Sequence, residues 1–235
     1  MRPIKTLERV LSKAGIGSRT EARKWIGEGR VRVNGRVVRD PDQWIDLKRD
    51  RVAFDGKLLG KTERVYLLFY KPKGYLTTYR DPQGRATIYD LLPKQDRYLF
   101  PVGRLDLDTS GLLILTNDTA FAERLTNPDY KVPKTYLVKA SKALTDAQLD
   151  QLRNGVNLRD GATRPAIVKR LAANKFEITI TEGRNRQVRR MVELFGAKVL
   201  KLVRVAIGRI RIGDLRIGGL RELTRNEIKV LSPES

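Results

Sequence analysis

The residues best suited to chemistry lie in one short segment, Gly103-Arg104-Leu105-Asp106-Leu107-Asp108-Thr109-Ser110-Gly111. Its glycines permit a sharp bend, and the apolar run that follows is typical of a buried strand. In an extended segment, Asp106 and Asp108 lie on one face about 6.5 Å apart, which suits the paired carboxylates of a glycoside hydrolase. On pattern alone, ordinary turn or capping roles are commoner for both acids. The segment therefore admits an enzyme that cleaves or rearranges a glycosidic bond, and an RNA nucleoside contains one.

A tyrosine in a strand-like run is the second candidate. Tyr136 lies within Lys134-Thr135-Tyr136-Leu137-Val138, whose residues favour β-structure. A packed aromatic is the commoner role for a tyrosine in such a run. The functional alternative is a ring that stacks on an unpaired RNA base.

An arginine cluster is predicted at the start of a later helix. Asn185 can cap this helix, and its first turns carry Arg186, Arg189 and Arg190. Cations at a helix N-terminus oppose the helix macrodipole. Either an anion such as an RNA phosphate or a buried carboxylate compensates these arginines, or they form a solvated face.

The missing residue types narrow the possible reactions. The chain of 235 residues has no histidine and no cysteine. This excludes disulfides, thiol chemistry and Ser-His-Asp triads, and it argues against zinc and most other transition-metal sites. Any catalysis must use Asp, Glu, Tyr, Lys, Arg or Ser.

Composition also indicates the kind of partner. The net charge of +21 and the pI of about 10.4 attract polyanions. The basic residues are spread over predicted turns, helices and strands, not gathered on one amphipathic helix, so they favour nucleic acid over an anionic membrane. No apolar run approaches the roughly 20 residues of a membrane span, and the start lacks the apolar region of a signal peptide. We therefore expect a cytoplasmic protein.

The first sixty residues predict a helix–helix–hairpin unit. Apolar residues at helical spacing indicate a helix over 7–14. Ser18 and Glu21 match a capping box for a second helix. Alternating valines around Asn34-Gly35 predict a hairpin over 31–38.

Basic residues concentrate on the second helix and the hairpin of this unit. The candidate RNA contacts among them are Arg19, Arg23, Lys24, Arg30 and Arg32. Charged runs of this kind are usually a solvated face. The unit nevertheless resembles the S4 RNA-binding module, with 18–22 and 29–35 as the matching segments. In that module basic residues grip phosphates and RNA shape with little sequence readout.

Beyond residue 60 the pattern predicts an α+β fold with a mixed, largely antiparallel sheet. The polar segment 61–64 is a predicted linker between a domain over 1–60 and a domain over 65–235. Strands are expected at 65–70, 76–79, 98–102, 111–116, 135–139, 165–171, 175–181, 199–205 and 207–212. Helices are expected at 118–126, 145–154 and 185–195.

Four segments, in chain order, resemble the pseudouridine synthases of the RsuA/RluB type, which carry an N-terminal S4 domain. They are Lys71-Pro72-Lys73-Gly74, the segment from Gly103 to Leu112, Lys134-Thr135-Tyr136, and the segment from Glu182 to Met191. The resemblance covers essentially the whole chain. Its most specific part is the Arg-Leu-Asp sequence followed by Thr-Ser-Gly. It implies a small S4-like RNA-binding domain followed by a pseudouridine synthase domain.

The resemblance also implies the reaction and the roles of the residues. Uracil is detached from ribose C1′, rotated and rejoined through C5, without cofactor or metal. Asp106 is then the nucleophile, by attack on C6 of the base or through a glycal route at the ribose. Tyr136 stacks on the uracil and can serve in removal of the C5 proton, and Arg189 pairs with Asp106, orients it and keeps it ionised. Arg104 supports the nucleotide, whose unstacking costs a few kcal/mol, and Asp108 has no catalytic role.

The expected partner is ribosomal RNA, bound by a monomer, with Arg186 and Arg190 as further contacts. The segments 71–75 and 81–85 look more like the large-subunit (23S) branch than the small-subunit (16S) branch. In residues 117–120 many relatives have Gly after Asp, a difference that concerns the helix start and not the chemistry. The long basic C-terminal tail of some large-subunit enzymes is not present, which bears on the exact substrate. Three alternatives stay open: the same reaction on 16S RNA, a non-catalytic S4-type RNA-binding or ribosome-assembly protein, and a hydrolase that uses both aspartates.

Overall fold

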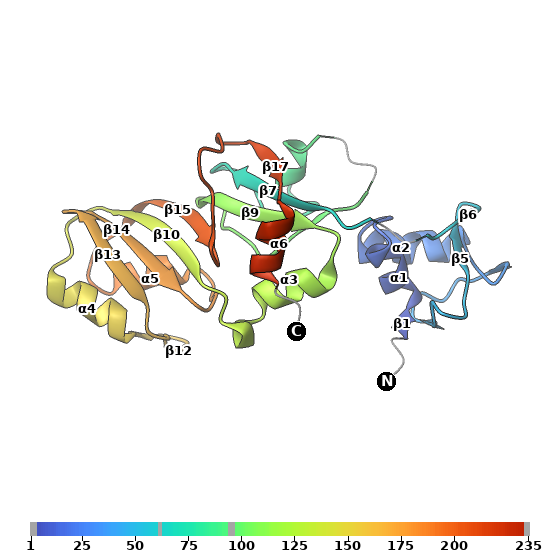
Figure 1. The fold of residues 1–235 in the computed structure, drawn as a ribbon, viewed down its shortest axis with the longest axis horizontal. Helices are drawn as coiled ribbons and strands as arrows, with labels where there is room; N and C mark the ends of the chain where they lie inside the picture. The colour runs from blue at the N-terminus through green and yellow to red at the C-terminus, as the bar shows by residue number, and fades with distance from the viewer. Residues whose placement is uncertain (1–3, 61–62, 94–96, 233–235) are drawn as a thin grey trace. The chain divides into compact units, whose positions relative to one another are not determined.

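The structure, a computed structural model, describes residues 4–60, 63–93 and 97–232, which form two compact units (Figure 1). Unit 1 comprises Met1–Val65 together with Pro93–Phe100 and Thr116–Thr119, and unit 2 contains the rest. Part of the expected linker, residues 61 and 62, lies outside the described residues. The division into domains over 1–60 and 65–235 therefore stays a prediction.

Unit 1 contains the two predicted helices, α1 (Leu7–Lys13) and α2 (Arg19–Gly27). The capping box is confirmed, because the Ser18 amide donates to the Glu21 carboxylate at 3.0 Å and the Glu21 amide donates to the Ser18 hydroxyl at 3.2 Å. Apolar residues of both helices pack into one small core with the strands of the unit.

The strands of unit 1 are short. They are β1 (Lys5–Thr6), β2 (Val31–Val33), β3 (Arg36–Val37), β4 (Trp44–Ile45), β5 (Val52–Phe54) and β6 (Lys57–Leu58). The predicted hairpin joins β2 and β3 through Asn34 and Gly35, whose φ values of 53° and 81° are those of a type I′ turn.

Within the described residues, one sheet of nine strands runs through unit 2. The strand order is β13-β14-β10-β15-β9-β7-β17, with β16 beside β15 and β8 beside β9. The strands are β7 (Tyr66–Lys71), β8 (Phe100–Pro101), β9 (Ser110–Thr116), β10 (Lys134–Ala140), β13 (Ile167–Ala172), β14 (Lys175–Ile180), β15 (Val199–Ile207), β16 (Ile210–Arg211) and β17 (Leu220–Glu222). Strand β10 is antiparallel to β14 and β15, whereas β15 is parallel to β9. The predicted α+β fold with a mixed, largely antiparallel sheet is confirmed.

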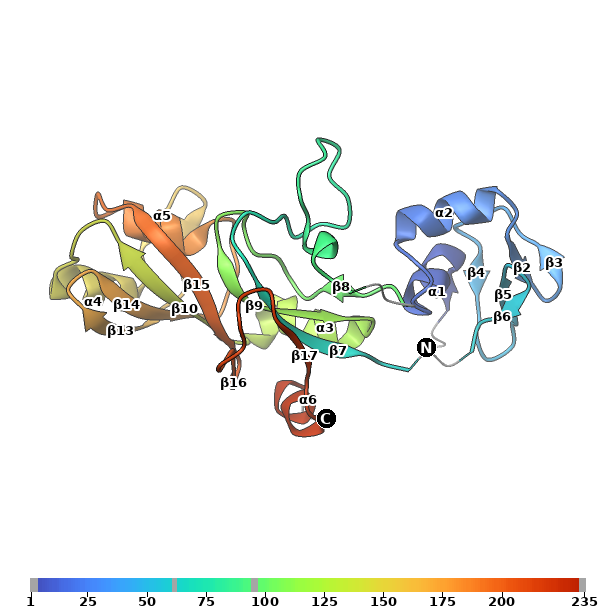
Figure 2. The same ribbon diagram turned by 90° about the horizontal axis from the view of Figure 1, so that it is seen from above.

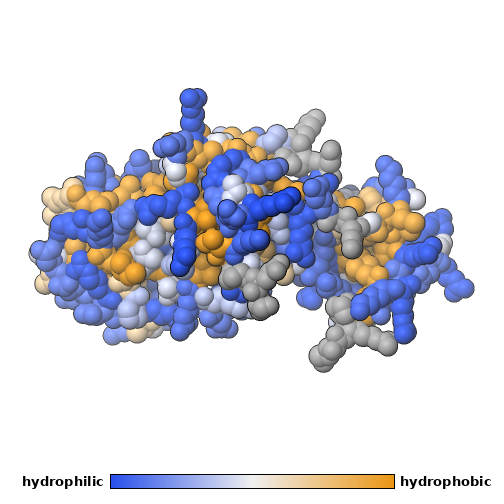
Figure 3. All heavy atoms as spheres, viewed as in Figure 1, coloured by the Kyte–Doolittle hydropathy of each residue, from blue (hydrophilic) through white to orange (hydrophobic). Residues whose placement is uncertain are grey.

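Helices and short turns complete unit 2. They are η1 (Ile88–Asp90), α3 (Thr119–Thr126), η2 (Pro128–Tyr130), α4 (Asp146–Asn154), α5 (Gln187–Glu193) and α6 (Arg225–Leu231), with the small hairpin of β11 (Asn157–Leu158) and β12 (Gly161–Ala162). Figure 3 shows hydrophilic side chains over most of the face in view, in keeping with the high net charge.

Three details of the unit 2 prediction are wrong. Residues 76–79 form no strand, because they lie in a loop that stands out from the sheet in Figure 2, where Leu76 makes only an isolated bridge to Thr87. The strands predicted at 199–205 and 207–212 are instead one long β15 followed by the short β16. Helix α5 is capped by Arg186 in place of Asn185, with a left-handed backbone (φ 48°, ψ 32°) and no side-chain capping bond.

The core of unit 2 ends where a pocket begins. Helices α4 and α5 pack on the face of the sheet that carries Val138 and Ala140 of β10. Tyr136, two residues earlier on the same face of the strand, is partly buried at the margin of this core. Lys134, two residues earlier again, lines the pocket. The register of β10 therefore decides that one end of its apolar face is core and the other end is a binding surface.

The parallel contact between β9 and β15 needs a glycine at residue 111. A Cβ built on Gly111 would lie 2.3 Å from the Arg204 carbonyl oxygen and 2.5 Å from its nitrogen, and the φ of Gly111 is +115°. No L-residue can occupy this position without moving one strand.

We predict that Gly111→Ala lowers the free energy of unfolding by about 3 kcal/mol or more, from backbone strain and overpacking together. Gly213→Ala is the matched control, since Gly213 also has a positive φ (+59°) but nothing within 4 Å of its Cβ position. Its cost should stay near 1–2 kcal/mol, roughly the left-handed penalty alone. Urea unfolding measures both, and equal losses would contradict the close-contact explanation.

Candidate active site

Asp106 begins a β-turn whose carbonyl groups are all bonded. The Thr109 amide donates to the Asp106 carbonyl at 3.0 Å, which closes the turn just before β9. The neighbouring carbonyls of Leu105 and Leu107 accept from the Thr77 hydroxyl and the Gly74 amide, each at 2.8 Å. The turn is therefore fixed by donors from the chain segment that follows β7.

Lys71 is the central donor to this turn. Its side chain is fully buried at the end of β7, and its ammonium donates to the carbonyl oxygens of Pro72, Asp106 and Thr109 at 3.1, 3.1 and 2.9 Å. Burial lowers the pKa of Lys71 to about 8, although the charges of Asp106 and Asp108 oppose that shift. Lys71 thus supports the turn as a cation enclosed by carbonyl dipoles.

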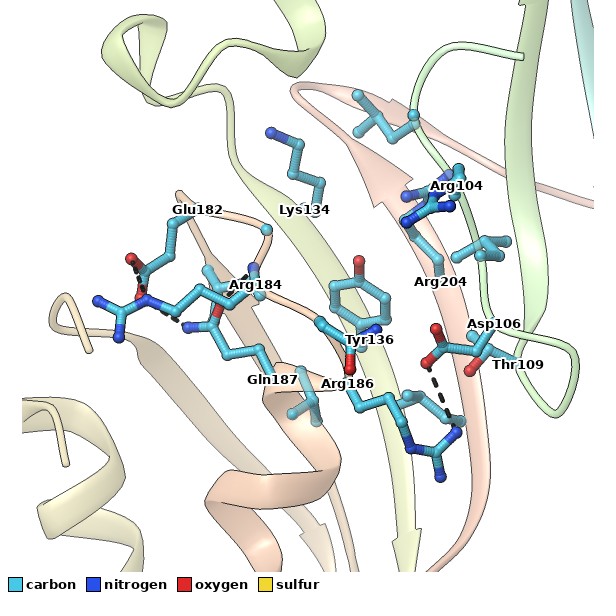
Figure 4. Close-up of a pocket in the computed structure, with 18 of the residues that line it drawn as sticks. Arg104, Asp106, Thr109, Lys134, Tyr136, Glu182, Arg184, Arg186, Gln187 and Arg204 are labelled. Carbon is cyan, nitrogen blue, oxygen red and sulfur yellow. Dashed lines mark hydrogen bonds and ion pairs between the residues drawn. The ribbon is translucent and has the colours of Figure 1, made fainter. Parts of the chain in front are cut away.

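The turn encloses one side of an open pocket of about 350 Å³, within the size range of small-molecule sites. Asp106, with a side chain 33% exposed, and Tyr136 both line it. Figure 4 shows these two residues facing the pocket from the turn and from β10, with Arg186 beside Asp106. The structure therefore brings together the predicted nucleophile and the predicted stacking ring.

Among the described residues, the structure does not contain the expected ion pair between Arg189 and Asp106. Arg189 instead donates to the Asp108 carbonyl at 3.0 Å and lies 3.2 Å from the Asp108 carboxylate. Its other contacts are the Val199 carbonyl and the Thr109 hydroxyl, at 3.1 and 3.3 Å. Arg189 is buried and is not among the residues that line the pocket. It supports the turn from beneath, because the third residue of α5 points into the protein.

The guanidinium nearest to Asp106 belongs to Arg186, at 3.9 Å. Arg186 also donates to both carboxylate oxygens of Asp108, at 3.2 and 3.3 Å. Burial opposes ionisation of Asp108, but the hydrogen bonds from Arg186 and the charge of Arg189 hold its pKa below the ordinary value. Two arginines therefore occupy Asp108 and leave Asp106 the more available carboxylate.

The candidate RNA contacts in unit 1 differ in how strongly they are engaged by other protein groups. Glu8, 1% exposed, accepts hydrogen bonds from both Arg19 and Arg23, and Arg23 also pairs with Asp42 at 2.6 Å. Burial opposes this charge, yet the two arginines hold the pKa of Glu8 below its ordinary value. Arg19 and Arg23 are still about half exposed, so Glu8 fixes them on the surface.

Three other candidates of unit 1 are exposed. Arg30 pairs with Asp55 at 2.5 Å and lies over the rings of Trp25 and Phe54. Lys24, 74% exposed, has only a loose contact of 3.8 Å with Glu28, and Arg32 donates to the Gly35 carbonyl at 3.0 Å. Lys24 and Arg32 are thus the more available pair.

Among the candidates of unit 2, Arg104 is exposed and lines the pocket beside the turn. Arg190 does not line the pocket, because its guanidinium faces Asp160 and donates to both carboxylate oxygens of Asp160, at 2.7 and 3.0 Å. It orders the β11–β12 hairpin, so its prediction as an RNA contact has no support from this geometry.

Several residues that line the pocket were not selected from the sequence. They are Lys134, Glu182, Arg184, Gln187 and Arg204. Arg204 offered a signal, since it is a charged residue inside the otherwise apolar end of β15 and is only 4% exposed. Within the described parts of the chain, no group of three or more acidic residues could hold a metal ion, and no helix could cross a membrane.

Comparison with known proteins fits this geometry. A family model described as RNA pseudouridylate synthase matches residues 65–194, which include the turn, Tyr136 and α5, and an S4 domain model matches residues 6–46. The fold and the family matches are those of an enzyme class that isomerises a nucleoside within RNA. The chain belongs to the RNA pseudouridylate synthase family.

Individual relatives resemble the chain over nearly its full length. A protein of Bacillus subtilis (strain 168) named "Ribosomal large subunit pseudouridine synthase B" is 39% identical over 96% of this chain and 94% of its own. An uncharacterized RNA pseudouridine synthase of Aquifex aeolicus (strain VF5) is 42% identical over 96% of this chain and 92% of its own. A solved structure described as "Crystal structure of pseudouridylate synthase" is 32% identical, with a TM-score of 0.72 over 96% of this chain and 99% of that one.

We predict that Lys71→Met lowers the free energy of unfolding by about 3 kcal/mol or more at neutral pH, because three carbonyl groups each lose a charged donor. The loss should also depend on pH. Native Lys71 releases its proton near pH 8, whereas the unfolded lysine keeps it to about 10.5. Between these values the unfolded wild type binds more protons than the native one, so its stability rises with pH relative to the variant.

Urea unfolding of both proteins at about pH 7.5 and about pH 9.5 measures this effect. The difference in stability should widen at the higher pH. Lys134, whose pKa burial also lowers to about 8, is present in both proteins and cancels. A difference that stays constant or narrows would show that Lys71 is not held at a lowered pKa.

Proposed function

We propose that this protein converts uridine to pseudouridine in large-subunit ribosomal RNA, with Asp106 as the nucleophile. The observation that carries the proposal is an available Asp106 carboxylate beside Tyr136, on a turn whose backbone is bonded at every carbonyl from Leu105 to Thr109. The name of the Bacillus subtilis relative supports the large-subunit target. Such a substrate is consistent with a cytoplasmic enzyme, which we take to act as a monomer.

The reaction needs an oriented nucleophile and no redox partner. The C1′–N1 bond of uridine breaks, a C1′–C5 bond forms, the proton on C5 leaves and N1 gains one. Asp106 either adds to C6 of the base or assists a glycal route at the ribose. Its fixed turn supplies orientation, which is worth several orders of magnitude in rate when the reacting atoms are held in place.

Tyr136 supports this chemistry from the floor of the pocket. Its ring lies on the face of β10 whose one end packs in the core and whose other end lines the pocket. A base that leaves the RNA stack can recover stacking energy on such a ring, about 1–3 kcal/mol per base. We assign Tyr136 to stacking on the uracil and to the late removal of the C5 proton.

The hydrolase alternative requires Asp108 as a second catalytic carboxylate. Asp108 does not line the pocket and is bonded by two arginines. An acid engaged in this way cannot turn toward a substrate without breaking both contacts. We therefore assign Asp108 to positioning of Arg186 and of the turn.

The test is tritium release from C5-labelled uridine in unmodified 23S RNA. Asp106→Asn should reduce the rate by at least roughly a thousandfold, as expected for loss of a nucleophile, with RNA binding retained. Asp108→Asn is the matched acid-to-amide control, and we expect a loss of at most about tenfold, because Asp108 does not line the pocket and its carboxylate is partly exposed.

Mapping of pseudouridine in the treated RNA then locates the target. Release from 16S and not 23S RNA would overturn the subunit assignment alone. No release from either RNA would overturn the activity, and equal losses in the two variants would favour the two-carboxylate mechanism.

For RNA binding by unit 1 we propose that Lys24 and Arg32 contact phosphates. Each contact should contribute about 0.7–0.9 to the slope of log affinity against log salt. We predict that the double variant Lys24→Gln/Arg32→Gln binds 23S RNA more weakly and with a slope lower by about 1.5. The control Lys169→Gln/Lys175→Gln removes the same charge from exposed positions of β13 and β14. Equal slopes for the two double variants would contradict the assignment.

A further inference from the structure

One end of the pocket carries two cations that nothing in the reaction described so far uses. Lys134 lies two residues from Tyr136 on β10 and therefore on the same face, and Arg204 of β15 is the direct cross-strand partner of Tyr136. Both side chains line the pocket, and Figure 4 shows them on the two strands that carry its floor. Strand register thus places an aromatic ring and two positive groups together on one surface.

The guanidinium of Arg204 is incompletely bonded although it is almost entirely buried. Its Nε donates to the Leu112 carbonyl at 2.7 Å, which ties β15 to β9. Its Nη2 is buried and has no hydrogen-bond partner within the described parts of the chain, in a side chain only 4% exposed. A buried donor of a charged group without an acceptor costs about 1–3 kcal/mol or more, so an acceptor is expected in the functional complex.

Lys134 is in a similar position. Among the described residues it has no ion pair or hydrogen bond from its ammonium, although it is partly buried. Burial, and next the positive charge of Arg204, lower its pKa to about 8. Two cations that repel one another across a pocket define a place where an anion lowers the energy of both.

The acids of the pocket do not supply that anion. The described lining contains two carboxylates, Asp106 and Glu182. Asp106 faces Arg186. Glu182 accepts from the Gln187 amide at 2.6 Å and from the Arg164 backbone at 3.0 Å, and it pairs with Arg184 at 3.3 Å. The compensating charge must come from the ligand.

We propose that Lys134 and Arg204 form a subsite for a backbone phosphate of the RNA, one that flanks the uridine stacked on Tyr136. This inference rests on the proposed function and adds the part of the substrate that these two residues hold. A phosphodiester carries a permanent negative charge and several acceptor oxygens, so it can accept from a lysine and an arginine at once. The neutral carbonyl oxygens of uracil carry no such charge before the glycosidic bond breaks.

The experiment uses a short RNA that contains the mapped target uridine. Methylphosphonate replaces the phosphate on its 5′ side in one RNA and on its 3′ side in another, which removes the negative charge of one linkage at a time. Binding is measured with Asp106→Asn proteins and turnover with proteins that keep Asp106. The variants are Lys134→Met, the charge-preserving Lys134→Arg, and Lys139→Met, which removes an exposed lysine from the same strand.

One of the two methylphosphonate RNAs should bind the protein with wild-type Lys134 roughly tenfold or more weakly, the usual size of a lost charged hydrogen bond. Lys134→Met should lose a similar factor with the unmodified RNA and nothing further with that methylphosphonate RNA. Lys134→Arg should bind better than Lys134→Met, and Lys139→Met should behave as wild type with every RNA. Lys134→Met should also unfold at no lower temperature, because it removes an uncompensated, partly buried cation.

Two results overturn the subsite. If Lys134→Met and each methylphosphonate weaken binding by factors that multiply when they are combined, the lysine and the phosphates act independently. If Lys134→Met lowers the turnover rate while binding is unchanged, the cation acts on a uracil oxygen and not on a phosphate. Failure of the proposed function is recognised separately. In that case no pseudouridine is mapped, so there is no target uridine from which to design the short RNA.

Discussion

The ammonium of Lys71, buried among backbone carbonyls, is the interaction on which the active site depends. A fully buried lysine without a carboxylate in hydrogen-bonding contact is costly, and here carbonyl dipoles of Pro72, Asp106 and Thr109 offset the cost. The same contacts join the end of β7 to the turn before β9. They fix the backbone of Asp106, while its carboxylate points into the pocket. The turn is thereby prepared before RNA binds, which is the condition for efficient use of a nucleophile.

Positive charge is distributed in two different ways around this centre. In unit 1, buried Glu8 holds Arg19 and Arg23 in place, which limits the side-chain entropy lost on binding. In the pocket, Lys134 and the Nη2 of Arg204 find no acceptor among the residues that the structure describes. The second arrangement lowers stability, as is common at functional sites. If the proposed contacts hold, part of the charge of +21 has specific uses beyond general attraction to RNA.

Sequence patterns predicted what depends on local physics. The Ser18–Glu21 capping box and the Asn34-Gly35 hairpin are each specified by a few adjacent residues, and both are confirmed. Family resemblance selected Asp106 and Tyr136, which share the pocket. The predicted partner of Arg189 was wrong because the direction of this side chain depends on where α5 begins, and the left-handed cap Arg186 moves that start by one residue from the one expected with Asn185 as cap. Lys134 and Arg204 were missed because their proximity depends on the register between β10 and β15, which neither segment encodes alone.

The most direct test of the account is the single-turnover rate of pseudouridine formation at saturating protein, compared between wild type and Lys71→Met. Asp106 itself is unchanged in this variant, which removes the three hydrogen bonds from Lys71 and its positive charge. Small displacements of a reacting group can cost about a hundredfold. We predict a rate at least roughly a hundredfold lower with RNA affinity within about twofold of wild type. A folded Lys71→Met protein that reacts at the wild-type rate would contradict the claim that the carbonyl-bound lysine positions the nucleophile.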